Sequence, residues 1–429
     1  MALQNLLIEH ESEWLDALRA DLGKSPQDAY VSEIGFVLGE IRHALKHLAV
    51  WTRPERRRTP LLAWPASAEM RQEPFGVALI IGPWNYPLQL LLSPLVGAIA
   101  AGNCAILKPS EFAPHTAAVV DRLIRSAFPE EYLATVEGGR ETSEALLAEC
   151  FDAIFFTGST ATGRAVMTAA ARHLTPVILE LGGKCPCIVA HDAPVELTAR
   201  RIVWGKFINA GQTCVAPDHV WVDRRVAPAL LAALQKTLRN FYGDDPRTSA
   251  DYSRIINRRH LDRLTNYLSD GTIAHGGAVE PTELYLAPTI LTEPSKASPV
   301  MSEEIFGPIL PILEFSDLDD VLADLRERPS PLAVYGFTAS RELQDRLLAG
   351  TRSGGVCFND TILQILGHDL PFGGVGASGM GRYHGRASFD CFSHQRVVLR
   401  RSLAVDLPFR YPPIKTSLAA LRRLLRFTG

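Results

Sequence analysis

The sequence predicts an α/β protein whose core is a mostly parallel sheet with helices on both faces. Short, continuously apolar segments at 75–81, 104–107 and 152–156 are expected to be strands, and helical segments at 88–101 and 114–128 separate them. Strands of this kind, alternating with helices, are typical of parallel sheets that are buried on both sides. Because ligands of such sheets bind at the carboxyl ends of the strands, we expect the functional residues there.

The segment before this alternation is predicted to be helical and then extended. Apolar residues recur at helical spacing through 2–22 and predict one amphipathic helix. Ser25, followed by Pro26, is expected to begin a second helix that ends near residue 51. Residues 52–74 contain four prolines and a cluster of arginines. We expect them to form an extended arm that packs on another subunit or domain, with an anion-binding patch as the alternative.

The alternation of strands and helices continues along the rest of the chain. Further strands are expected near 134–137 and 284–292 and at 176–181, 309–314 and 334–338. Further helices are expected at 141–149, 163–173, 227–242, 257–268 and 318–328. No internal repeat is present, which excludes a solenoid.

The composition is that of an ordinary globular protein of 429 residues, a length that suggests two or three domains. A net charge of −3 gives no indication of a nucleic-acid partner. Seven cysteines, an odd number, argue against a disulfide framework and indicate a reducing, cytoplasmic setting. No metal site is expected, since Cys185 and Cys187 have no second pair of ligands. The N-terminus does not resemble a signal peptide, and the longest apolar run is shorter than the roughly 20 residues that cross a bilayer.

A single cysteine, Cys214, lies in the segment 205–217, which is rich in small residues and precedes a strand-like run at 219–223. Small residues allow backbone and substrate to approach a thiol closely, as a nucleophile requires. Most cysteines are buried small hydrophobes, however, so this pattern alone does not assign catalysis.

Two turns after predicted strands carry residues suited to a nucleotide. Gly158 and Gly163 follow the strand at 152–156, and exposed N–H groups at the start of a helix can bind a phosphate. An ordinary turn fits equally well, and Arg164 replaces the lysine that a triphosphate-binding loop needs. Lys108 and Glu111 lie just past another strand, where they either contact ribose hydroxyls or form a solvated loop.

Three other segments carry groups that could act with a thiol. Asn85, in a rigid turn between two aromatic residues, either donates to an oxyanion or caps a helix. Glu180 ends an apolar strand, where a carboxylate is costly without a task, and the natural task is that of a general base. Five glycines within 371–381 fit either a flexible loop over a pocket or a strained turn.

These segments together resemble the aldehyde dehydrogenase superfamily from about residue 70 to 395. The matching motifs are Pro-Trp-Asn at 83–85, Leu-Lys-Pro-Ser-Glu at 107–111, Phe-Thr-Gly-Ser-Thr at 156–160, Leu-Glu-Leu-Gly-Gly-Lys at 179–184, Gly-Gln-Thr-Cys at 211–214, Glu-Glu-Ile-Phe-Gly-Pro at 303–308 and Pro-Phe-Gly-Gly at 371–374. The lack of a long N-terminal extension and the segments 388–394 and 410–413 are similar to the class 3 branch, which includes enzymes for fatty and aromatic aldehydes.

The resemblance implies a Rossmann-type cofactor domain, an α/β catalytic domain and a small oligomerisation arm. The dinucleotide-binding domain would comprise 1–51 and 75–181, and the catalytic domain 182–385. Segments 52–74 and 386–411 would be oligomerisation or bridging segments, and 412–429 a C-terminal amphipathic tail. The tail is expected to dock on the dimer or a neighbouring domain, with weak contact to a membrane surface as the alternative. A homodimer is expected.

By the same resemblance, Cys214 is the nucleophile, Glu180 the general base and Asn85 the oxyanion donor. NAD or NADP would be bound by Trp84, Lys108, Glu111, Gly158, Ser159, Gly163, Leu181, Glu304 and Phe306. Of these, Lys108 and Glu111 would contact the adenine-side ribose, and Gly158, Ser159 and Gly163 the pyrophosphate. Glu304 would bind the nicotinamide-side ribose, with Phe306 near the ring and Trp84 lining the same cleft.

The implied function is NAD(P)-dependent oxidation of a medium- or long-chain aliphatic or aromatic aldehyde to the carboxylic acid, through a thiohemiacetal and a thioester on Cys214. A CoA-acylating dehydrogenase is one alternative, against which Glu180 argues, because a deacylating base is useful only when water is the acceptor. A non-catalytic binding or structural protein is another, against which the joint presence of Cys214, Glu180 and Asn85 argues.

Overall fold

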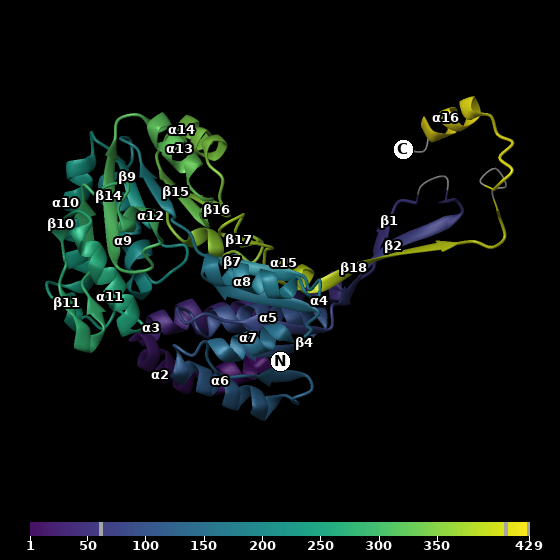
Figure 1. The fold of residues 1–429 in the computed structure, drawn as a ribbon, viewed down its shortest axis with the longest axis horizontal. Helices are drawn as coiled ribbons and strands as arrows, with labels where there is room; N and C mark the ends of the chain where they lie inside the picture. The colour runs from purple at the N-terminus through teal and green to yellow at the C-terminus, as the bar shows by residue number, and fades with distance from the viewer. Residues whose placement is uncertain (60–62, 407–410, 427–429) are drawn as a thin grey trace.

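The computed structural model describes residues 1–59, 63–406 and 411–426, without the side chains of Leu424 and Leu425. Two parallel-rich sheets lie side by side in the body, and a narrow third sheet extends away from it as an arm (Figure 1). The predicted segments 52–74, 386–411 and 412–429 therefore lie in part outside the described residues.

The first sheet has the strand order β17-β7-β6-β3-β4-β5 in the described chain. Its strands are β3 (Val77–Ile81), β4 (Cys104–Lys108), β5 (Leu133–Thr135), β6 (Ala153–Gly158), β7 (Val177–Leu181) and β17 (Gly379–Met380). All its pairs are parallel except β17 with β7. The chain runs outward from β3 through β4 and β5 and then returns to β6 on the other side of β3. A crevice at the carboxyl ends of β3 and β6 is thus the expected ligand site of this sheet.

Helices cover this sheet, and those of the N-terminal segment pack into the same hydrophobic core. They are α1 (Ala2–Glu9), α2 (Glu11–Leu22), α3 (Pro26–Ala29), α4 (Gly35–Trp51), α5 (Gln89–Ala101), α6 (Pro114–Ala127), α7 (Arg140–Ala148) and α8 (Thr160–Ala170), with a π-helical turn at Tyr30–Ile34. The prediction of one helix over 2–22 is wrong, because the chain turns at His10, whose φ is −113°. The turn lets both α1 and α2 bury leucines in the same core. The Ser25 cap is confirmed, since its hydroxyl accepts the Asp28 N–H at 3.3 Å.

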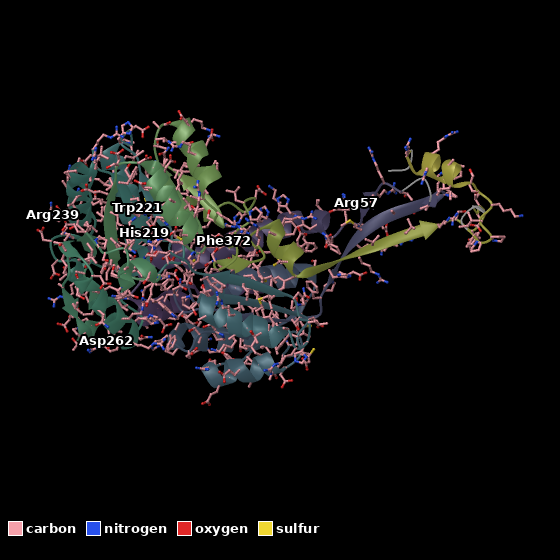
Figure 2. The ribbon with its side chains drawn as sticks, turned by 45° about the horizontal axis from the view of Figure 1, so that its top comes forward. Arg57, His219, Trp221, Arg239, Asp262 and Phe372 are labelled. Carbon is pink, nitrogen blue, oxygen red and sulfur yellow. The ribbon has the colours of Figure 1, made fainter. Side chains whose placement is uncertain are left out.

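The second sheet has the order β10-β13-β14-β9-β8-β15-β16 within the described ranges, and β10 is its antiparallel strand. Its strands are β8 (Pro186–Val189), β9 (His219–Asp223), β10 (Thr272–His275), β13 (Thr289–Thr292), β14 (Ile309–Phe315), β15 (Ala333–Phe337) and β16 (Gly355–Phe358), beside the hairpin β11 (Val279–Glu280) and β12 (Tyr285–Leu286). Its helices are α9 (Val195–Phe207), α10 (Ala227–Tyr242), α11 (Arg258–Asn266), α12 (Pro299–Ser302), α13 (Leu318–Glu327) and α14 (Arg341–Gly350). Phe372 packs against the cores of both sheets and lies between them (Figure 2).

The arm consists of β1 (Glu55–Arg57), β2 (Ala66–Pro74) and β18 (Ser393–Arg401), and α15 (Arg386–Cys391) leads into it. Strands β2 and β18 pair antiparallel from Ser393 opposite Pro74 to Arg401 opposite Ala66. The sequence did not predict these strands, because few of their side chains are buried and the apolar alternation that marks a half-buried strand is weak. Arg57 lies on this arm, away from the body (Figure 2). The helix α16 (Leu418–Arg426) follows the arm in the chain and is drawn near the outer part of the arm in Figure 1.

None of the helices in the described ranges has the length and the apolar composition that crossing a membrane requires.

Candidate active site

Two neighbouring strands of the first sheet end in buried polar side chains that lack partners. Thr157 of β6 lies in register with Glu180 of β7, and their exposed fractions are 8% and 2%. Neither the Thr157 hydroxyl nor either carboxylate oxygen of Glu180 bonds to another described residue. Leaving a buried polar group unpaired costs about 1–3 kcal/mol, so such a pair indicates a functional site. Burial raises the pKa of Glu180 well above 4.5, and the charge of Arg382 opposes this only in part.

The glycine-rich segment 371–381 supports the Glu180 strand. Gly379 of β17 lies opposite Glu180, and a Cβ on Gly379 would lie 2.2 Å from the Leu179 carbonyl oxygen. A Cβ on Gly374 would lie 1.9 Å from the Ser378 carbonyl oxygen. Of the two alternatives for this segment, the structure therefore favours a tightly packed turn.

Cys214 follows a turn that only its tertiary contacts explain. After α9, the backbone is left-handed at Asn209, Ala210 and Gly211, with φ of 52°, 51° and 75°. A Cβ on Gly211 would lie 2.2 Å from the Gly307 carbonyl oxygen. This position therefore requires glycine both for its positive φ and for lack of space.

The fully buried side chain of Gln212 holds this turn in place. Its amide donates to the carbonyl oxygens of Asn209 and Arg254 at 3.0 and 2.9 Å, and accepts the Ile256 N–H at 3.0 Å. The loop is thereby held by three hydrogen bonds before it reaches Cys214.

The turn after β3 is tied to the same loop. The Asn85 side-chain amide donates to the Gln212 carbonyl at 3.0 Å, and the Asn209 amide donates to the Asn85 carbonyl at 2.8 Å. The Tyr86 and Thr213 hydroxyls share a hydrogen bond of 2.7 Å. The structure therefore brings Asn85 close to the cysteine loop, although more than 120 residues separate them in sequence.

The Cys214 thiol lies within electrostatic range of two carboxylates. Burial, followed by the charges of Glu304 and Glu180, raises its pKa to about 12, while the N–H groups of Cys214 and Val215 oppose the rise. The structure thus brings Cys214, Glu180 and Glu304 together. A thiol with this pKa is protonated at neutral pH and needs a proton acceptor before it reacts.

The residues predicted to bind the adenosine side of a dinucleotide lie at the carboxyl ends of β4 and β6. Lys108, with 2% exposed, forms an ion pair of 3.0 Å with Glu111. Ser159 follows Gly158 and caps α8, accepting the Thr162 N–H at 3.2 Å.

Helix α8 begins at Thr160, so the predicted start of this helix at residue 163 is wrong. A Cβ on Gly163 would lie 2.6 Å from a methyl group of Leu181. Gly163 and Leu181 therefore lie in the helix–sheet contact, where they allow α8 to approach β7 closely.

The residues predicted for the nicotinamide side lie where the two sheets meet. Trp84 and Phe306 form an edge-to-face contact with ring centroids 5.3 Å apart. A Cβ on Gly182 would lie 2.0 Å from a carboxylate oxygen of Glu304, so this glycine leaves room for that side chain. Burial and the charge of Asp218 raise the pKa of Glu304 to about 8, and a hydrogen bond from the Gly183 N–H opposes them.

A cavity of about 320 Å³ adjoins Gly182, Gly183 and Glu304 and extends between α8 and the loop 328–331. The end of β7 thus borders open space beside Glu304.

Thr157 and Gln212 were not among the residues for which the sequence predicted a role. A polar residue directly before the glycine that ends β6 was a usable signal for Thr157. No local signal distinguishes Gln212, whose partners come from other segments.

The model of the Aldehyde dehydrogenase family matches residues 1–398. The 4,4'-diaponeurosporen-aldehyde dehydrogenase of Staphylococcus aureus is 45% identical over 415 residues, which are 96% of this chain and 90% of that protein. The human aldehyde dehydrogenase family 3 member B1 is 47% identical over 413 residues, 96% of this chain and 88% of that protein.

Solved structures show the same relationship. The structure of Staphylococcus aureus AldH in its substrate-bound state matches with a TM-score of 0.97 and 44% identity, and covers 100% of this chain and 93% of that one. A variant of the indole-3-acetaldehyde dehydrogenase AldA of P. syringae, solved with NAD+ and IAA, matches with a TM-score of 0.84 and 26% identity, over 94% of this chain and 83% of that one.

Proposed function

Since this chain belongs to the aldehyde dehydrogenase family, we propose that Cys214, Glu180 and Asn85 are its catalytic residues. The chain oxidises aldehydes to carboxylic acids with NAD or NADP. The observation that carries the assignment is the buried Glu180 carboxylate, which has no partner in the described chain and lies within electrostatic range of the Cys214 thiol.

Cys214 is the nucleophile. Its thiol gives its proton to solvent water, and the resulting thiolate adds to the aldehyde carbon to form a tetrahedral oxyanion. The Asn85 amide then stabilises the oxyanion, because one of its two N–H groups is bonded to Gln212 and the other is left for a ligand. The bond to Gln212 keeps this donor beside the loop that presents the sulfur.

Glu180 is the general base of the second half-reaction. Once the carbon bound to Cys214 is a thioester, water attacks it, and Glu180 takes the proton of that water. The acid and the free thiol are released. Burial raises the pKa of Glu180, which makes its carboxylate a stronger base than an exposed glutamate.

NAD or NADP, when bound, accepts the hydrogen that the aldehyde carbon releases. The residues present fit a dinucleotide: Lys108 and Glu111 suit ribose hydroxyls, and Ser159 with the start of α8 suits a pyrophosphate. Glu304, above Gly182, suits the second ribose. Trp84 and Phe306, which contact each other, are proposed to lie beside the nicotinamide. Gly158 directly precedes Ser159, and Gly163 and Leu181 contribute by allowing α8 to pack closely on β7.

We propose the division into domains on the basis of these positions. The residues proposed to bind the adenosine side lie on the first sheet, which supports a dinucleotide-binding domain at 1–51 and 75–181. Cys214 precedes β9 of the second sheet, which supports a catalytic domain at 182–385.

The proposed substrate is a medium- or long-chain aliphatic or an aromatic aldehyde. Trp204 on α9 and Leu363 and Leu366 in the loop after β16 are 38%, 42% and 52% exposed. The two segments touch, because the Thr361 hydroxyl donates to the Arg201 carbonyl at 2.9 Å. Because α9 leads directly into the turn before Cys214, these exposed apolar side chains support an apolar substrate. The relative from Staphylococcus aureus is likewise named for an aldehyde, 4,4'-diaponeurosporen-aldehyde.

The arm supports a homodimer formed through 52–74 and 386–411. Val397 and Leu399 of β18 are 72% and 52% exposed, so a second copy could cover them. Sedimentation analysis of the wild type and of Val397→Asp tests this. The basic helix α16 is proposed to dock on the dimer, with weak membrane-surface contact as the alternative that vesicle flotation tests. All seven cysteines are free, which supports a reducing, cytoplasmic location.

The Cys214→Ser variant tests the catalytic assignment. We expect it to abolish aldehyde-dependent formation of reduced cofactor while dinucleotide binding, followed by tryptophan fluorescence, stays measurable. Cys150→Ser is the matched control, because Cys150 is free and exposed. Turnover like that of the wild type in Cys214→Ser would remove Cys214 from its role.

A further inference from the structure

The loop that carries Glu304 is bonded to a lysine, Lys184, to which the proposed mechanism assigns no role. Lys184 follows Gly182 and Gly183, and its ammonium pairs with Asp218; the two side chains are 11% and 4% exposed. The same ammonium donates to the carbonyl oxygens of Val300 and Glu303 at 2.6 and 3.0 Å. Lys184 therefore bonds to the residue directly before Glu304.

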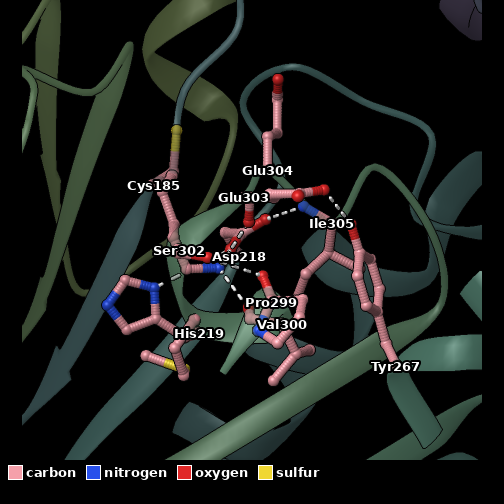
Figure 3. A network of polar contacts seen from close by, with 12 residues as sticks. Cys185, Asp218, His219, Tyr267, Pro299, Val300, Ser302, Glu303, Glu304 and Ile305 are labelled. Carbon is pink, nitrogen blue, oxygen red and sulfur yellow. Dashed lines mark hydrogen bonds and ion pairs between the residues drawn. The ribbon is translucent and has the colours of Figure 1, made fainter. Parts of the chain in front are cut away.

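Asp218 holds the residue directly after Glu304. Its second carboxylate oxygen accepts the Ile305 N–H at 2.9 Å. Figure 3 shows Asp218 among the residues of this loop, with the Glu304 side chain pointing away from the cluster. The backbone on both sides of Glu304 is thus tied to one ion pair.

Two residues of the α11 region complete the network. Arg263 donates to the carbonyl oxygens of Glu304 and Ile305 at 3.2 and 2.8 Å. The Tyr267 hydroxyl donates to the Glu303 carboxylate at 2.6 Å, a bond that is also seen in Figure 3. Glu303 thus faces the network, and Glu304 is left free to point toward Gly182.

The ion pair also connects the segments that carry the other proposed catalytic groups. Lys184 lies four residues after Glu180, and Asp218 four residues after Cys214. A buried ion pair is weak evidence for stability, because apolar residues of the same volume often serve as well, and its best-supported use is to set one arrangement among several. A pair placed at the junction of three functional segments fits that use.

We propose that Lys184 and Asp218 are positioning residues that set the Glu304 carboxylate for the nicotinamide-side ribose of the cofactor. This inference rests on the role proposed above for Glu304. The two residues act through the backbone of Glu303 and Ile305 and do not touch the cofactor or the reacting atoms.

The test compares Lys184→Met, Asp218→Asn and Glu304→Ala with the wild type. Asp218→Asn keeps an acceptor for the Ile305 N–H and loses the charge that Lys184 needs. The dissociation constant of NAD, measured by tryptophan fluorescence without aldehyde, is expected to rise about tenfold in the first two variants. This is the lower end of the effect seen when a residue that orients a metal ligand is lost. The KM for NAD should rise in parallel, and the KM for aldehyde should stay within about twofold.

Two controls separate positioning from general destabilisation. Lys184→Arg keeps a cation at this point and is expected to restore most of the affinity for NAD. Lys236→Met removes a lysine of the exposed pair with Glu196 and should leave NAD binding unchanged. The midpoint of thermal unfolding is measured for every variant.

A double variant decides whether Lys184 acts through Glu304. Lys184→Met combined with Glu304→Ala should bind NAD no more weakly than Glu304→Ala alone, because the second change removes what the first one positions. Additive losses would overturn the inference. So would unchanged NAD binding in a folded Lys184→Met while Glu304→Ala binds weakly.

Unchanged NAD binding in Glu304→Ala would refute the proposed role of Glu304 itself, which is a distinguishable result. If Lys184→Met does not fold, Asp218→Asn carries the same comparisons, and Tyr267→Phe, which removes only the outer bond to Glu303, should give a smaller change in the same direction.

Discussion

Replacing Glu180 by glutamine tests the proposed mechanism most directly. The substitution keeps the shape of the side chain and removes its capacity to accept a proton. No hydrogen bond within the described chain is lost, because neither carboxylate oxygen has a partner there. The variant should therefore fold, and any loss of activity reports on chemistry.

The expected effect on turnover is large. Loss of a general base typically slows a reaction by about 10²–10⁴, or about 3–5 kcal/mol of barrier. The loss should fall on hydrolysis of the thioester, which Glu180 serves, and leave the first half-reaction of Cys214 in place. The variant should then release one equivalent of reduced cofactor rapidly and continue slowly.

The same substitution should change how stability depends on pH. Burial raises the folded-state pKa of Glu180 above the unfolded value near 4.5, so folding opposes ionisation. The stability that the neutral carboxyl contributes is present below pH 4.5 and is lost as the pH rises toward the folded pKa. Relative to Glu180→Gln, the wild type should thus lose about 1.4 kcal/mol of unfolding free energy per pH unit across that window.

Rapid mixing with an aldehyde and NAD, followed by absorbance of the reduced cofactor, measures the burst, and mass spectrometry of the quenched protein detects the acyl group on Cys214. Glu314→Gln, an exposed carboxylate of β14, is the control and should behave as the wild type. Steady-state turnover that is unimpaired in Glu180→Gln, or a slow phase without a burst, would refute the assignment of Glu180 as the deacylating base.

Three further changes test other parts of the site. Asn85→Ala should lower kcat/KM for the aldehyde about 10²–10³-fold and leave the dissociation constant of NAD unchanged; an equal loss of NAD affinity would argue against an oxyanion donor. Gly211→Ala should destabilise the chain by about 1–3 kcal/mol in urea unfolding, because its Cβ meets a backbone oxygen. Gly243→Ala, with a similar φ of 78° and nothing within 4 Å, should cost less, and equal losses would contradict the role of the contact. Glu111→Gln should shift the ratio of kcat/KM values toward NADP, since one negative charge near the 2′-phosphate is removed, and an unchanged ratio would place Glu111 elsewhere.

Local pattern was sufficient for the order of the elements in the body. The apolar segments at 104–107 and 309–314 are strands, and 227–242 is the helix α10 with the predicted bounds. Each of these elements is buried on at least one face, so the spacing of its own apolar residues indicates its type. The strands of the arm could not be predicted from local pattern, because β2 and β18 pair with each other and bury few side chains.

The residues of the candidate site likewise fall into those that the sequence identified and those whose roles depend on tertiary contacts. The motifs shared with the aldehyde dehydrogenase superfamily were enough to single out Cys214, Glu180 and Asn85 as candidates, since each motif specifies a residue type at a fixed position. Distant contacts were needed to see that Glu180 has no partner, that Gln212 ties Asn85 to the cysteine loop, and that Gly163 serves helix packing.

Residue type and spacing therefore specified which groups this chain carries and in what kind of fold. Which of those groups meet, which stay unpaired and how far burial shifts each pKa depend on segments that are far apart along the chain. Those properties arise from desolvation and from hydrogen bonds between strand ends, and neither exists until the two sheets have packed together.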